Sequence, residues 1–377
     1  MRLAWDVTPL SVSATGIGRY LIGTISAVAA ARPAWDVCAI AVAEQAGIEM
    51  VRAQLADAPA NVVVRPTLKS PAWVTRRLAT ATGFPKLESF TGGPVDAFID
   101  SEWFRPHQKH GMRLSIAYDL IPLLYPEWVS SRTRKAHLRS LREIKSRADR
   151  IISISEVTKR DLVEQLGIPA ERIAIAAPGV GREYLEALPM PPAIVEERPY
   201  IVVVGTTNAR KNLIRMLEAF AAVAHTHSDL DLVVVGAPDV DEAAISAEVA
   251  RHGISDRVHR LGYQSDTELA GIVAAAQLLV FPSLYEGFGM PVVEAQSVGV
   301  PVAASSTPSL DEACGSAAER FDPVDAIAMA EAITRVLDDV ARRDELVRLG
   351  LEHAKTFTWA AAGEAIARVI EGSRGTA

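Results

Sequence analysis

Short runs of Val, Ile and Leu alternate with helical patterns along all 377 residues of the chain. Runs such as Tyr200–Val204 and Leu278–Phe281 are continuously apolar, which is typical of parallel strands covered by helices on both faces. The pattern therefore predicts an α/β protein with doubly wound parallel sheets. Strands are expected at Leu3–Val7, Val37–Val42, Asn61–Val64, Ala97–Ile99, Leu114–Ala117, Ile151–Ile154, Ile173–Ala176, Tyr200–Val204, Asp231–Val235, Val258–Leu261, Leu278–Phe281 and Val302–Ala304. Expected helices include Arg19–Ala31, Thr133–Arg147, Lys159–Leu166, Leu213–Ala224, Glu242–Arg251, Asp266–Ala276 and Ala326–Val340.

A proline-rich segment divides these strands into two sets of similar size. Four prolines lie from Pro189 to Pro199, and neither a helix nor a central strand can continue through them. We expect two Rossmann-like domains, residues 1–188 and 200–358, joined by a linker at 189–199. The C-terminal segment 359–377, with a helix at about Trp359–Ile370, can pack back on the first domain. Open α/β sheets bind ligands beyond the carboxyl ends of their strands, so two such domains would hold a site in a cleft between them.

Composition excludes several classes of function. The formal net charge of −7 argues against a general nucleic-acid binder. No apolar run reaches membrane-spanning length, and the N-terminus begins with a strand-like segment rather than a signal peptide. The two cysteines, Cys38 and Cys314, lack metal-ligand spacing and are expected to be buried thiols. These features favour a cytoplasmic protein.

Two glutamates flank a glycine turn in the segment Tyr285–Ala295. Glu286 and Glu294 enclose Gly287-Phe288-Gly289, shortly after an apolar strand. Glycine lets backbone N–H groups approach a ligand, and Pro291 suits the first position of a helix. Glu294 is then expected in the first helical turn, beside unpaired amides and the positive end of the helix dipole. Either glutamate alone could be an ordinary capping residue; the paired spacing favours a ligand site.

A basic loop follows the strand that opens the second domain. The strand ends at Gly205, and Thr206 leads to the adjacent cations Arg210 and Lys211, just before the helix that begins at Leu213. A helix N-terminus with cations beside it favours an anion, in particular a diphosphate. A solvated basic pair that caps the helix is the alternative. The position at the carboxyl end of a strand favours phosphate binding.

Two motifs in the first domain are less specific. Gly16 and Gly18 form a glycine loop that could approach a phosphate or a sugar, although an ordinary tight turn explains them equally well. Their spacing is not that of a dinucleotide-binding loop, which disfavours an NAD-dependent oxidoreductase. Tyr118 and Asp119 follow the strand Leu114–Ala117, so Asp119 could face a cleft or simply cap the turn before Pro122.

Residues 132–150 carry a dense run of arginine and lysine together with an apolar stripe at helical spacing. Basic amphipathic helices can lie on anionic membranes, but more often the stripe packs on the core and the charges are solvated. Asp239-Val240-Asp241 matches a metal-binding pattern, yet its place before a helix favours capping. The histidine pairs at 107/110 and 225/227 do not form a convincing ligand set, so no metal site is expected.

The combination of motifs resembles the family-four retaining glycosyltransferases, whose GT-B fold has two Rossmann-like domains facing across a central cleft. The matching segments are Glu286 to Glu294, Gly205-Thr206 with Arg210-Lys211-Asn212, and Gly16-Ile17-Gly18-Arg19. The similarity covers nearly the whole chain. With Asp119-Leu120-Ile121-Pro122, the chain is most similar to mannosyltransferase-like members that build bacterial polysaccharides and O-antigens.

The resemblance implies a donor site in the second domain. Arg210 and Lys211 would hold the donor diphosphate after the Gly205-Thr206 turn and stabilise the leaving nucleotide. Glu286 would contact hydroxyls of the transferred sugar, and Glu294 would bind the donor ribose. The remaining implied donor contacts are the backbone of Gly287, Phe288 and Gly289, the nucleobase pocket around Gly262 and Tyr263, and the approach of Gly16 and Gly18 to the diphosphate and acceptor.

One position departs from the family pattern. Related sequences commonly have His-Asp where this chain has Tyr118-Asp119. A tyrosine hydroxyl can donate a hydrogen bond but is not a base near neutral pH, so Tyr118 either orients the substrate or its presence alters activity. Catalysis would then depend on positioning and on stabilising the departing diphosphate. No carboxylate pair is arranged as in retaining glycosidases, which favours a front-face transfer.

The expected function is a metal-independent retaining hexosyltransferase with a nucleotide diphosphate sugar as donor and no separate cofactor. A GDP-linked mannose or deoxyhexose is favoured, with a lipid-linked or polysaccharide acceptor and peripheral contact of residues 132–150 with the inner face of the plasma membrane. A sugar-nucleotide epimerase or a phosphorylase of the same fold is the first alternative, and an epimerase would convert the donor without an acceptor. A non-catalytic sugar-nucleotide-binding subunit, which Tyr118 makes conceivable, would bind the donor without transfer.

Overall fold

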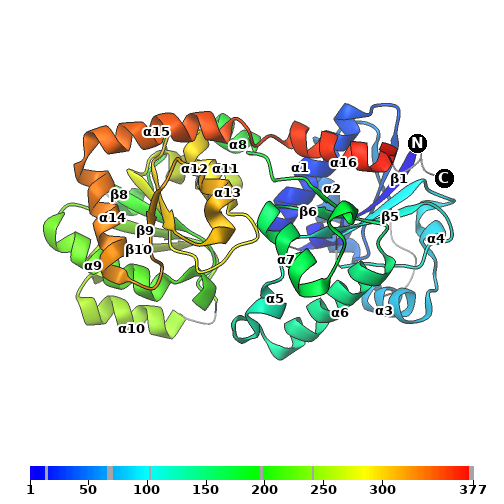
Figure 1. The fold of residues 1–377 in the computed structure, drawn as a ribbon, viewed down its shortest axis with the longest axis horizontal. Coiled ribbons are helices and arrows are strands. Elements are labelled where there is room, and N and C mark those ends of the chain that lie inside the picture. The colour runs from blue at the N-terminus through cyan, green and yellow to red at the C-terminus, as the bar shows by residue number, and fades with distance from the viewer. Residues whose placement is uncertain (13–15, 66–70, 102, 196–197, 240–241, 373–377) are drawn as a thin grey trace. The chain divides into compact units, whose positions relative to one another are not determined.

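The computed structural model describes residues 1–12, 16–65, 71–101, 103–195, 198–239 and 242–372. The chain divides into two compact units (Figure 1). The first unit combines Met1–Gly179 with Thr358–Ala377, and the second unit is Val180–Phe357. Each unit contains one parallel sheet with flanking helices, so the predicted doubly wound α/β class is confirmed. None of the described helices is both long enough and apolar enough to cross a membrane.

The sheet of the first unit has the order β3-β2-β1-β4-β5-β6-β7. Its strands are β1 (Arg2–Asp6), β2 (Asp36–Ile40), β3 (Val62–Arg65), β4 (Ala97–Asp100), β5 (Met112–Ala117), β6 (Arg150–Ser153) and β7 (Ile173–Ile175). Its α-helices are α1 (Gly16–Ala31), α2 (Gln45–Gln54), α3 (Ala72–Thr82), α4 (Leu87–Thr91), α5 (Ile121–Leu124), α6 (Ser131–Arg147), α7 (Glu156–Leu166) and α16 (Trp359–Gly372). Short 3₁₀ turns lie at Thr8–Ser11, Pro126–Trp128 and Ala170–Arg172.

The sheet of the second unit has the order β10-β9-β8-β11-β12-β13. Its strands are β8 (Tyr200–Val204), β9 (Asp231–Val235), β10 (Val258–Gly262), β11 (Leu278–Phe281), β12 (Val302–Ser305) and β13 (Glu319–Phe321). Its α-helices are α8 (Arg182–Leu185), α9 (Leu213–Thr226), α10 (Glu242–His252), α11 (Asp266–Ala274), α12 (Met290–Ser297), α13 (Asp311–Cys314), α14 (Ala326–Asp338) and α15 (Val340–Ala354). The 3₁₀ turns are η4 (Ala193–Val195), η5 (Ala209–Lys211), η6 (Ser255–Arg257) and η7 (Pro308–Leu310).

The division of the chain differs from the expected boundaries at one place. Residues 180–199, expected in the first domain and a linker, belong to the second unit. The physical reason is that α8 packs on α11 and that the N–H of Met190 donates to the carbonyl of Gly271 at 2.9 Å. Prolines in this segment end regular structure without separating it from the second unit.

Helix α16 completes the first unit by packing along α1, as the red and blue helices of Figure 1 show. Glycines make this close approach feasible. A Cβ atom on Gly363 would lie 2.6 Å from the Cβ of Ala27 and 2.9 Å from the backbone nitrogen of Val28. Arg32, after the end of α1, forms ion pairs with Glu364 at 3.0 Å and Glu371 at 2.6 Å, which add charge complementarity to the contact.

Replacing Gly363 tests this helix contact. Gly363→Ala improves helix propensity but places a methyl group inside contact distance of the α1 backbone, so we expect a net loss of about 1–3 kcal/mol in the free energy of unfolding. Gly372→Ala in the same helix is the matched control, because its Cβ would meet no atom within 4 Å. Chemical denaturation compares the two variants, and equal stabilities would contradict the predicted overlap.

Asp6 is a fully buried carboxyl group at the carboxyl end of β1. It accepts hydrogen bonds from the Ser101 hydroxyl, the Thr8 N–H at 3.0 Å and the Phe104 N–H at 3.0 Å. Burial raises the pKa of Asp6 from its ordinary 3.8 to about 6, although the hydrogen bonds from Ser101 and Thr8 oppose this rise. The folded protein therefore binds a proton here more tightly than the unfolded chain does.

This raised pKa predicts a pH dependence of stability. The contribution of Asp6 is fully present below about pH 4 and is lost as the pH rises through about 6. Relative to Asp6→Asn, which cannot titrate, the free energy of unfolding of the wild type should fall by about 3 kcal/mol between those limits. Urea denaturation across this range measures the difference, and parallel pH profiles for the two proteins would contradict it.

Candidate functional site

Gly205 sets the geometry of the loop that follows β8. Its φ of 149° lies in a region that favours glycine, and a Cβ there would lie 2.8 Å from the Cε atom of Lys211. The Lys211 side chain thus passes directly over the Gly205 backbone. Its ammonium lies 4.6 Å from the centroid of the Phe281 ring at the end of β11. Thr206 is exposed, and its hydroxyl accepts a hydrogen bond from the Asn208 amide at 2.8 Å.

Asn212 fixes the loop to the neighbouring strand ends. It is the only described non-glycine residue with positive φ, at 57°, a conformation that Asn tolerates better than most residues. Its buried side-chain amide donates to the carbonyls of Pro282 at 3.1 Å and Pro323 at 2.7 Å. This structural role of Asn212 was not predicted; the signal available was an asparagine placed between a basic pair and a helix.

Three side chains from two loops meet at the carboxyl ends of β8 and β11. The Lys211 Nζ atom lies 2.6 Å from Glu286 Oε1, and the nearest guanidinium nitrogen of Arg210 lies 2.6 Å from Glu286 Oε2. The exposed fractions of the Arg210, Lys211 and Glu286 side chains are 19%, 13% and 11%. Arg210 also donates to the carbonyl of Tyr285 at 3.0 Å, and the Leu284 N–H donates to the carbonyl of Arg210 at 2.9 Å. Backbone and side chains thus hold the two loops together.

The ion pairs determine the charge state of the cluster. Burial alone would raise the pKa of Glu286, but Lys211 and Arg210 outweigh burial and lower this pKa to about 2. Burial lowers the pKa of Lys211, as does the nearby Arg210, while Glu286 opposes both. The Glu286 carboxylate is therefore ionised throughout the neutral pH range, and the cluster combines two cationic groups with one anion.

Ser309 supports the backbone of Glu286 from a third loop. This serine is in η7 after β12, is 2% exposed and accepts a hydrogen bond from the Glu286 N–H at 3.0 Å. Its hydroxyl lies 3.1 Å from that of Thr307. Ser309 was not predicted as a site residue, because nothing in the local pattern Ser-Ser-Thr-Pro-Ser indicates a partner 23 residues earlier.

The turn after Glu286 leads into α12, and here one expectation is wrong. Gly289 is the N-cap with φ 105°, and α12 begins at Met290, so Pro291 is the second helical residue rather than the first. Glu294 is consequently the fifth residue and lies beyond the first turn, which contains no acidic residue. Its side chain is buried, 1% exposed. The shift arises because Gly289 adopts the left-handed N-cap conformation and leaves Met290 to open the helix.

Other residues of the expected donor site have varied environments. Gly287 and Phe288 are buried, and the Phe288 ring contacts that of Phe357 with centroids 5.2 Å apart. Gly262 ends β10 with φ 68°, and the following Tyr263 is 56% exposed. An exposed aromatic ring just beyond a strand's carboxyl end is available for stacking on a planar ligand.

The four candidate residues of the first unit lie in the segments that follow β1 and β5. Gly16 and Gly18 belong to the first turn of α1, which corrects the expectation of a glycine loop ahead of a helix from Arg19; Thr15 lies outside the described residues. Tyr118 is 7% exposed and its ring contacts Tyr20 edge-on, with centroids 5.8 Å apart. Asp119 accepts a hydrogen bond from the Ile121 N–H at 2.9 Å, so it caps the turn before α5. Of the Asp239-Val240-Asp241 segment, residues 240 and 241 also lie outside the described residues.

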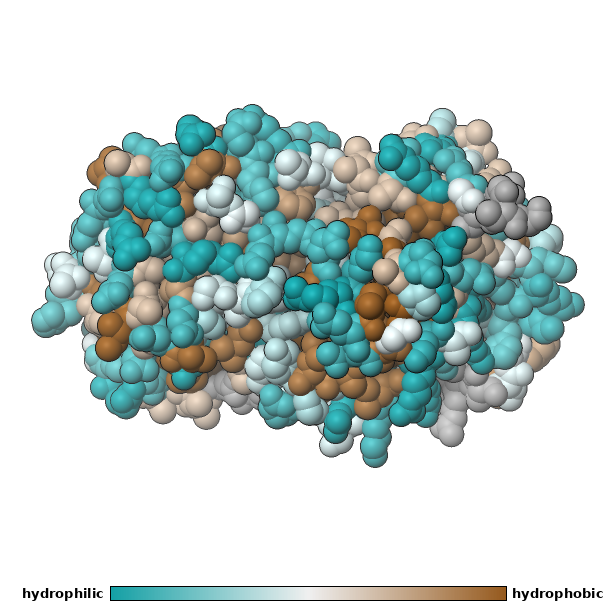
Figure 2. Space-filling view, in the orientation of Figure 1, coloured by the Kyte–Doolittle hydropathy of each residue, from teal (hydrophilic) through white to brown (hydrophobic). Residues whose placement is uncertain are grey.

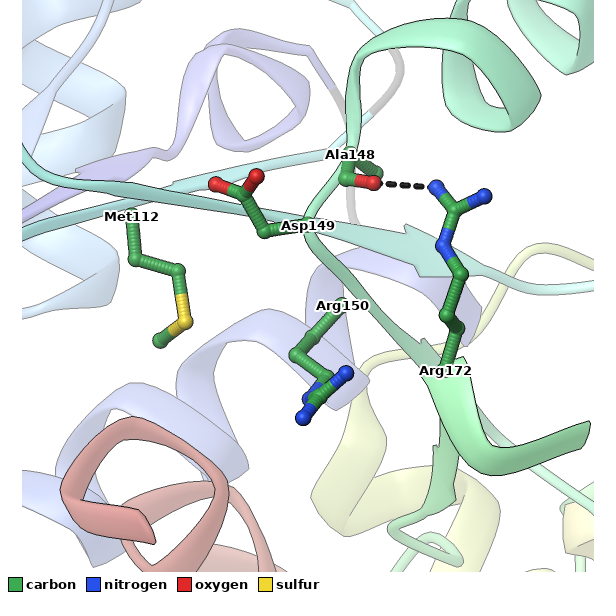
Figure 3. Close-up of a pocket in the computed structure, with 5 residues that line it drawn as sticks. All are labelled: Met112, Ala148, Asp149, Arg150 and Arg172. Atoms are coloured by element: carbon green, nitrogen blue, oxygen red, sulfur yellow. Dashed lines mark hydrogen bonds between the residues drawn. The ribbon is translucent and has the colours of Figure 1, made fainter. Parts of the chain in front are cut away.

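An open pocket of about 550 Å³ in the first unit lies away from these strand ends. Met112 and Arg150, the first residues of β5 and β6, line it together with Ala148, Asp149 and Arg172 (Figure 3). Arg172 donates to the carbonyls of Ala148 and Lys145 at the end of α6, where cations complement the helix dipole. Its position at the amino ends of the strands and this capping contact indicate a structural role for Arg172 rather than a ligand site.

Helix α6 contains most of the basic segment 132–150. Leu141 and Ile144 are buried in a core cluster with Leu120 and Ile151, so the apolar stripe packs inward. Its arginines and lysines are exposed at positions 132, 134, 135, 139, 142, 145 and 147. Figure 2 shows hydrophobic surface in the region of α5, bordered by hydrophilic side chains along α6. Any contact of α6 with a membrane would therefore depend on charge.

Comparison with known proteins identifies the second unit. The model of the family "Glycosyl transferases group 1" matches residues 186–352. The chain is 28% identical over 264 residues to O-antigen chain mannosyltransferase B of Escherichia coli, covering 68% of this chain and 69% of that protein. It is 29% identical over 249 residues to D-inositol 3-phosphate glycosyltransferase of Salinispora tropica, covering 60% of this chain and 51% of that protein, about half its length.

The fold has a close counterpart among solved structures. WaaG, described as a glycosyltransferase involved in lipopolysaccharide biosynthesis, superposes with a TM-score of 0.70 at 18% identity, covering 99% of this chain and 100% of that chain. At this identity the likeness shows the fold alone. The two Rossmann-like units and this match indicate the GT-B fold. We conclude that this chain has the GT-B fold and that its residues 186–352 form a glycosyl transferases group 1 domain.

Proposed function

We propose that the protein is a metal-independent, retaining hexosyltransferase that uses a nucleotide diphosphate sugar. The observation that carries this proposal is the convergence of Arg210 and Lys211 with Glu286 at the carboxyl ends of β8 and β11. Open α/β sheets bind ligands at this edge, and adjacent cations suit a diphosphate. Two positive charges at one position can neutralise the charge that develops on a leaving diphosphate, which is the task a metal ion would otherwise perform.

The proposed mechanism assigns each group one task. Arg210 and Lys211 bind the diphosphate while the bond from its oxygen to the sugar's anomeric carbon breaks. The acceptor hydroxyl forms its bond to the anomeric carbon on the same face and gives its proton to the departing diphosphate oxygen, so the configuration is retained. Glu286 accepts hydrogen bonds from the sugar, and Glu294 binds the ribose. Asp119 and Tyr118 of the first unit are assigned to acceptor binding. A covalent sugar adduct on a carboxylate of the first unit would contradict this mechanism.

Mannose from a GDP-linked donor is the favoured hexose. The support is the similarity to O-antigen chain mannosyltransferase B over 68% of the chain. A lipid-linked or polysaccharide acceptor follows from the same relative, and the exposed basic residues of α6 would contact an anionic membrane surface where such acceptors lie. A thermal-shift screen against GDP, UDP, ADP and dTDP sugars tests the donor, because a ligand that binds only the folded state raises its stability.

Lys211→Ala tests the diphosphate contact. Removing the ammonium leaves Arg210 alone to stabilise the leaving group, so hexose transfer from GDP-mannose to a membrane lipid fraction should fall at least a hundredfold. Lys355→Ala, which removes an exposed lysine of the same unit, is the control and should keep wild-type transfer. Full activity of Lys211→Ala would refute the assignment. Conversion of the donor without acceptor would favour an epimerase, and donor binding without transfer would favour a binding subunit.

Charge reversal on α6 tests the membrane contact. Arg134→Glu combined with Lys135→Glu should lower binding to phosphatidylglycerol vesicles about tenfold or more, because each basic residue near the surface contributes about 1 kcal/mol. Arg348→Glu combined with Lys355→Glu makes the same change on exposed residues of the second unit and should have little effect. Vesicle co-sedimentation measures both proteins, and equal losses would assign the effect to net charge rather than to α6.

A further inference from the structure

The single carboxylate of Glu286 forms ion pairs with both cations of the cluster. Its Oε1 atom lies 2.6 Å from Lys211 and its Oε2 atom 2.6 Å from Arg210, so each oxygen is paired with a different positive group. The three side chains are largely buried. Opposite charges attract more strongly in a buried environment than at an exposed surface. The ion pairs are therefore substantial competitors for any other anion.

Under the proposed function, the same two cations bind the donor diphosphate. The diphosphate and the Glu286 carboxylate are both anionic, so one gains contact with the cations at the expense of the other. The carboxylate is also held nearby: the Glu286 N–H is bound to Ser309, and the Lys211 side chain is confined between Gly205 and the Phe281 ring. Diphosphate binding therefore weakens the ion pairs of Glu286. The net free energy of binding depends on which other hydrogen bonds the carboxylate then accepts.

We propose that Glu286 is a specificity-determining residue that makes the site favour the intact nucleotide sugar over the nucleotide diphosphate that transfer releases. This inference depends on the proposed function. With the intact donor, sugar hydroxyls donate hydrogen bonds to the carboxylate and compensate it for weakened ion pairs. With the nucleotide diphosphate alone, no sugar hydroxyl is present, and the carboxylate competes for Arg210 and Lys211.

A consequence for the reaction cycle follows directly. Transfer removes the sugar and with it the hydrogen bonds that drew the carboxylate away from the cations. The carboxylate then regains its ion pairs and weakens the hold on the product. The lowered pKa of Glu286, about 2, means that this competition operates with a full negative charge at neutral pH. Glu286 would thus assist catalysis and product release with the same two oxygens.

Glu286→Gln in the full chain separates this role from simple sugar contact. The amide keeps the shape of the side chain but no longer competes as an anion. Isothermal titration calorimetry with inorganic diphosphate, a probe that carries neither base nor sugar, and with GDP should give at least fivefold tighter binding than the wild type. Transfer from GDP-mannose should nevertheless fall at least a hundredfold. Equal or weaker binding of both probes would overturn the inference.

Two further variants complete the experiment. Glu331→Gln removes one negative charge from the exposed side of α14 and should bind both probes like the wild type; a gain equal to that of Glu286→Gln would overturn the inference by assigning the effect to net charge. Glu286→Asp keeps the charge but withdraws it by one methylene, so its binding should be intermediate. This variant also provides the test if Glu286→Gln fails to fold, which circular dichroism monitors.

Lys211→Ala distinguishes failure of this inference from failure of the proposed function. If the cations bind the diphosphate, this variant should bind inorganic diphosphate at least tenfold more weakly. Unchanged binding would contradict the diphosphate site itself. Weakened binding in Lys211→Ala without any gain in Glu286→Gln would contradict only the competitive role of Glu286.

Discussion

The carboxylate that Arg210 and Lys211 share is the interaction on which the ligand edge of the second unit depends. A charge removed from water is costly unless it is paired and hydrogen-bonded. The Glu286 carboxylate therefore offsets the burial of both cations, and all three side chains require loops that bring them to one place. The loops after β8, β11 and β12 meet this requirement with backbone contacts as well as side chains, including the bond from Glu286 to Ser309.

Backbone conformation makes the cluster geometrically possible. Gly205 gives space to the Lys211 side chain, and Asn212 reverses the chain in a left-handed conformation while binding carbonyls after β11 and β13. Gly289 starts α12 in a similar conformation, and its Cβ would collide with Leu310 at 2.7 Å. The spacing of the motifs thus reflects steric requirements as much as chemistry, since larger residues at these positions would separate the charged groups.

The sequence predicts the buried strands well and local helix geometry less well. Three buried strands have the predicted bounds: Tyr200–Val204, Asp231–Val235 and Leu278–Phe281. A continuous apolar run can be interpreted without tertiary context. The edge strand β13 was missed, since Glu319-Arg320-Phe321 has no such run. The starts of four helices, α1, α6, α7 and α12, were also misplaced.

The predicted site shows the same limits of local patterns. The local patterns indicated two separate ligand motifs, one at Glu286 and one at Arg210-Lys211, and only the family resemblance implied a common donor site; the structure brings these residues together. Contacts between residues that are distant in sequence, such as that of Ser309 with Glu286, could not be predicted from the local sequence pattern. The start of α12 depends on the φ angle of Gly289, which residue types alone did not determine, and Glu294 was misplaced for that reason.

The return of α16 to α1 makes the second unit an insertion within the first. Domains commonly fold as they leave the ribosome, beginning with the N-terminal one. In this chain the second unit can complete its fold before the first: residues 180–357 can finish folding while the first unit still lacks its last helix. Until α16 emerges, the α1 surface that Gly363 contacts remains uncovered. During synthesis, the N-terminal residues that are made first are therefore the last to form all of their native contacts.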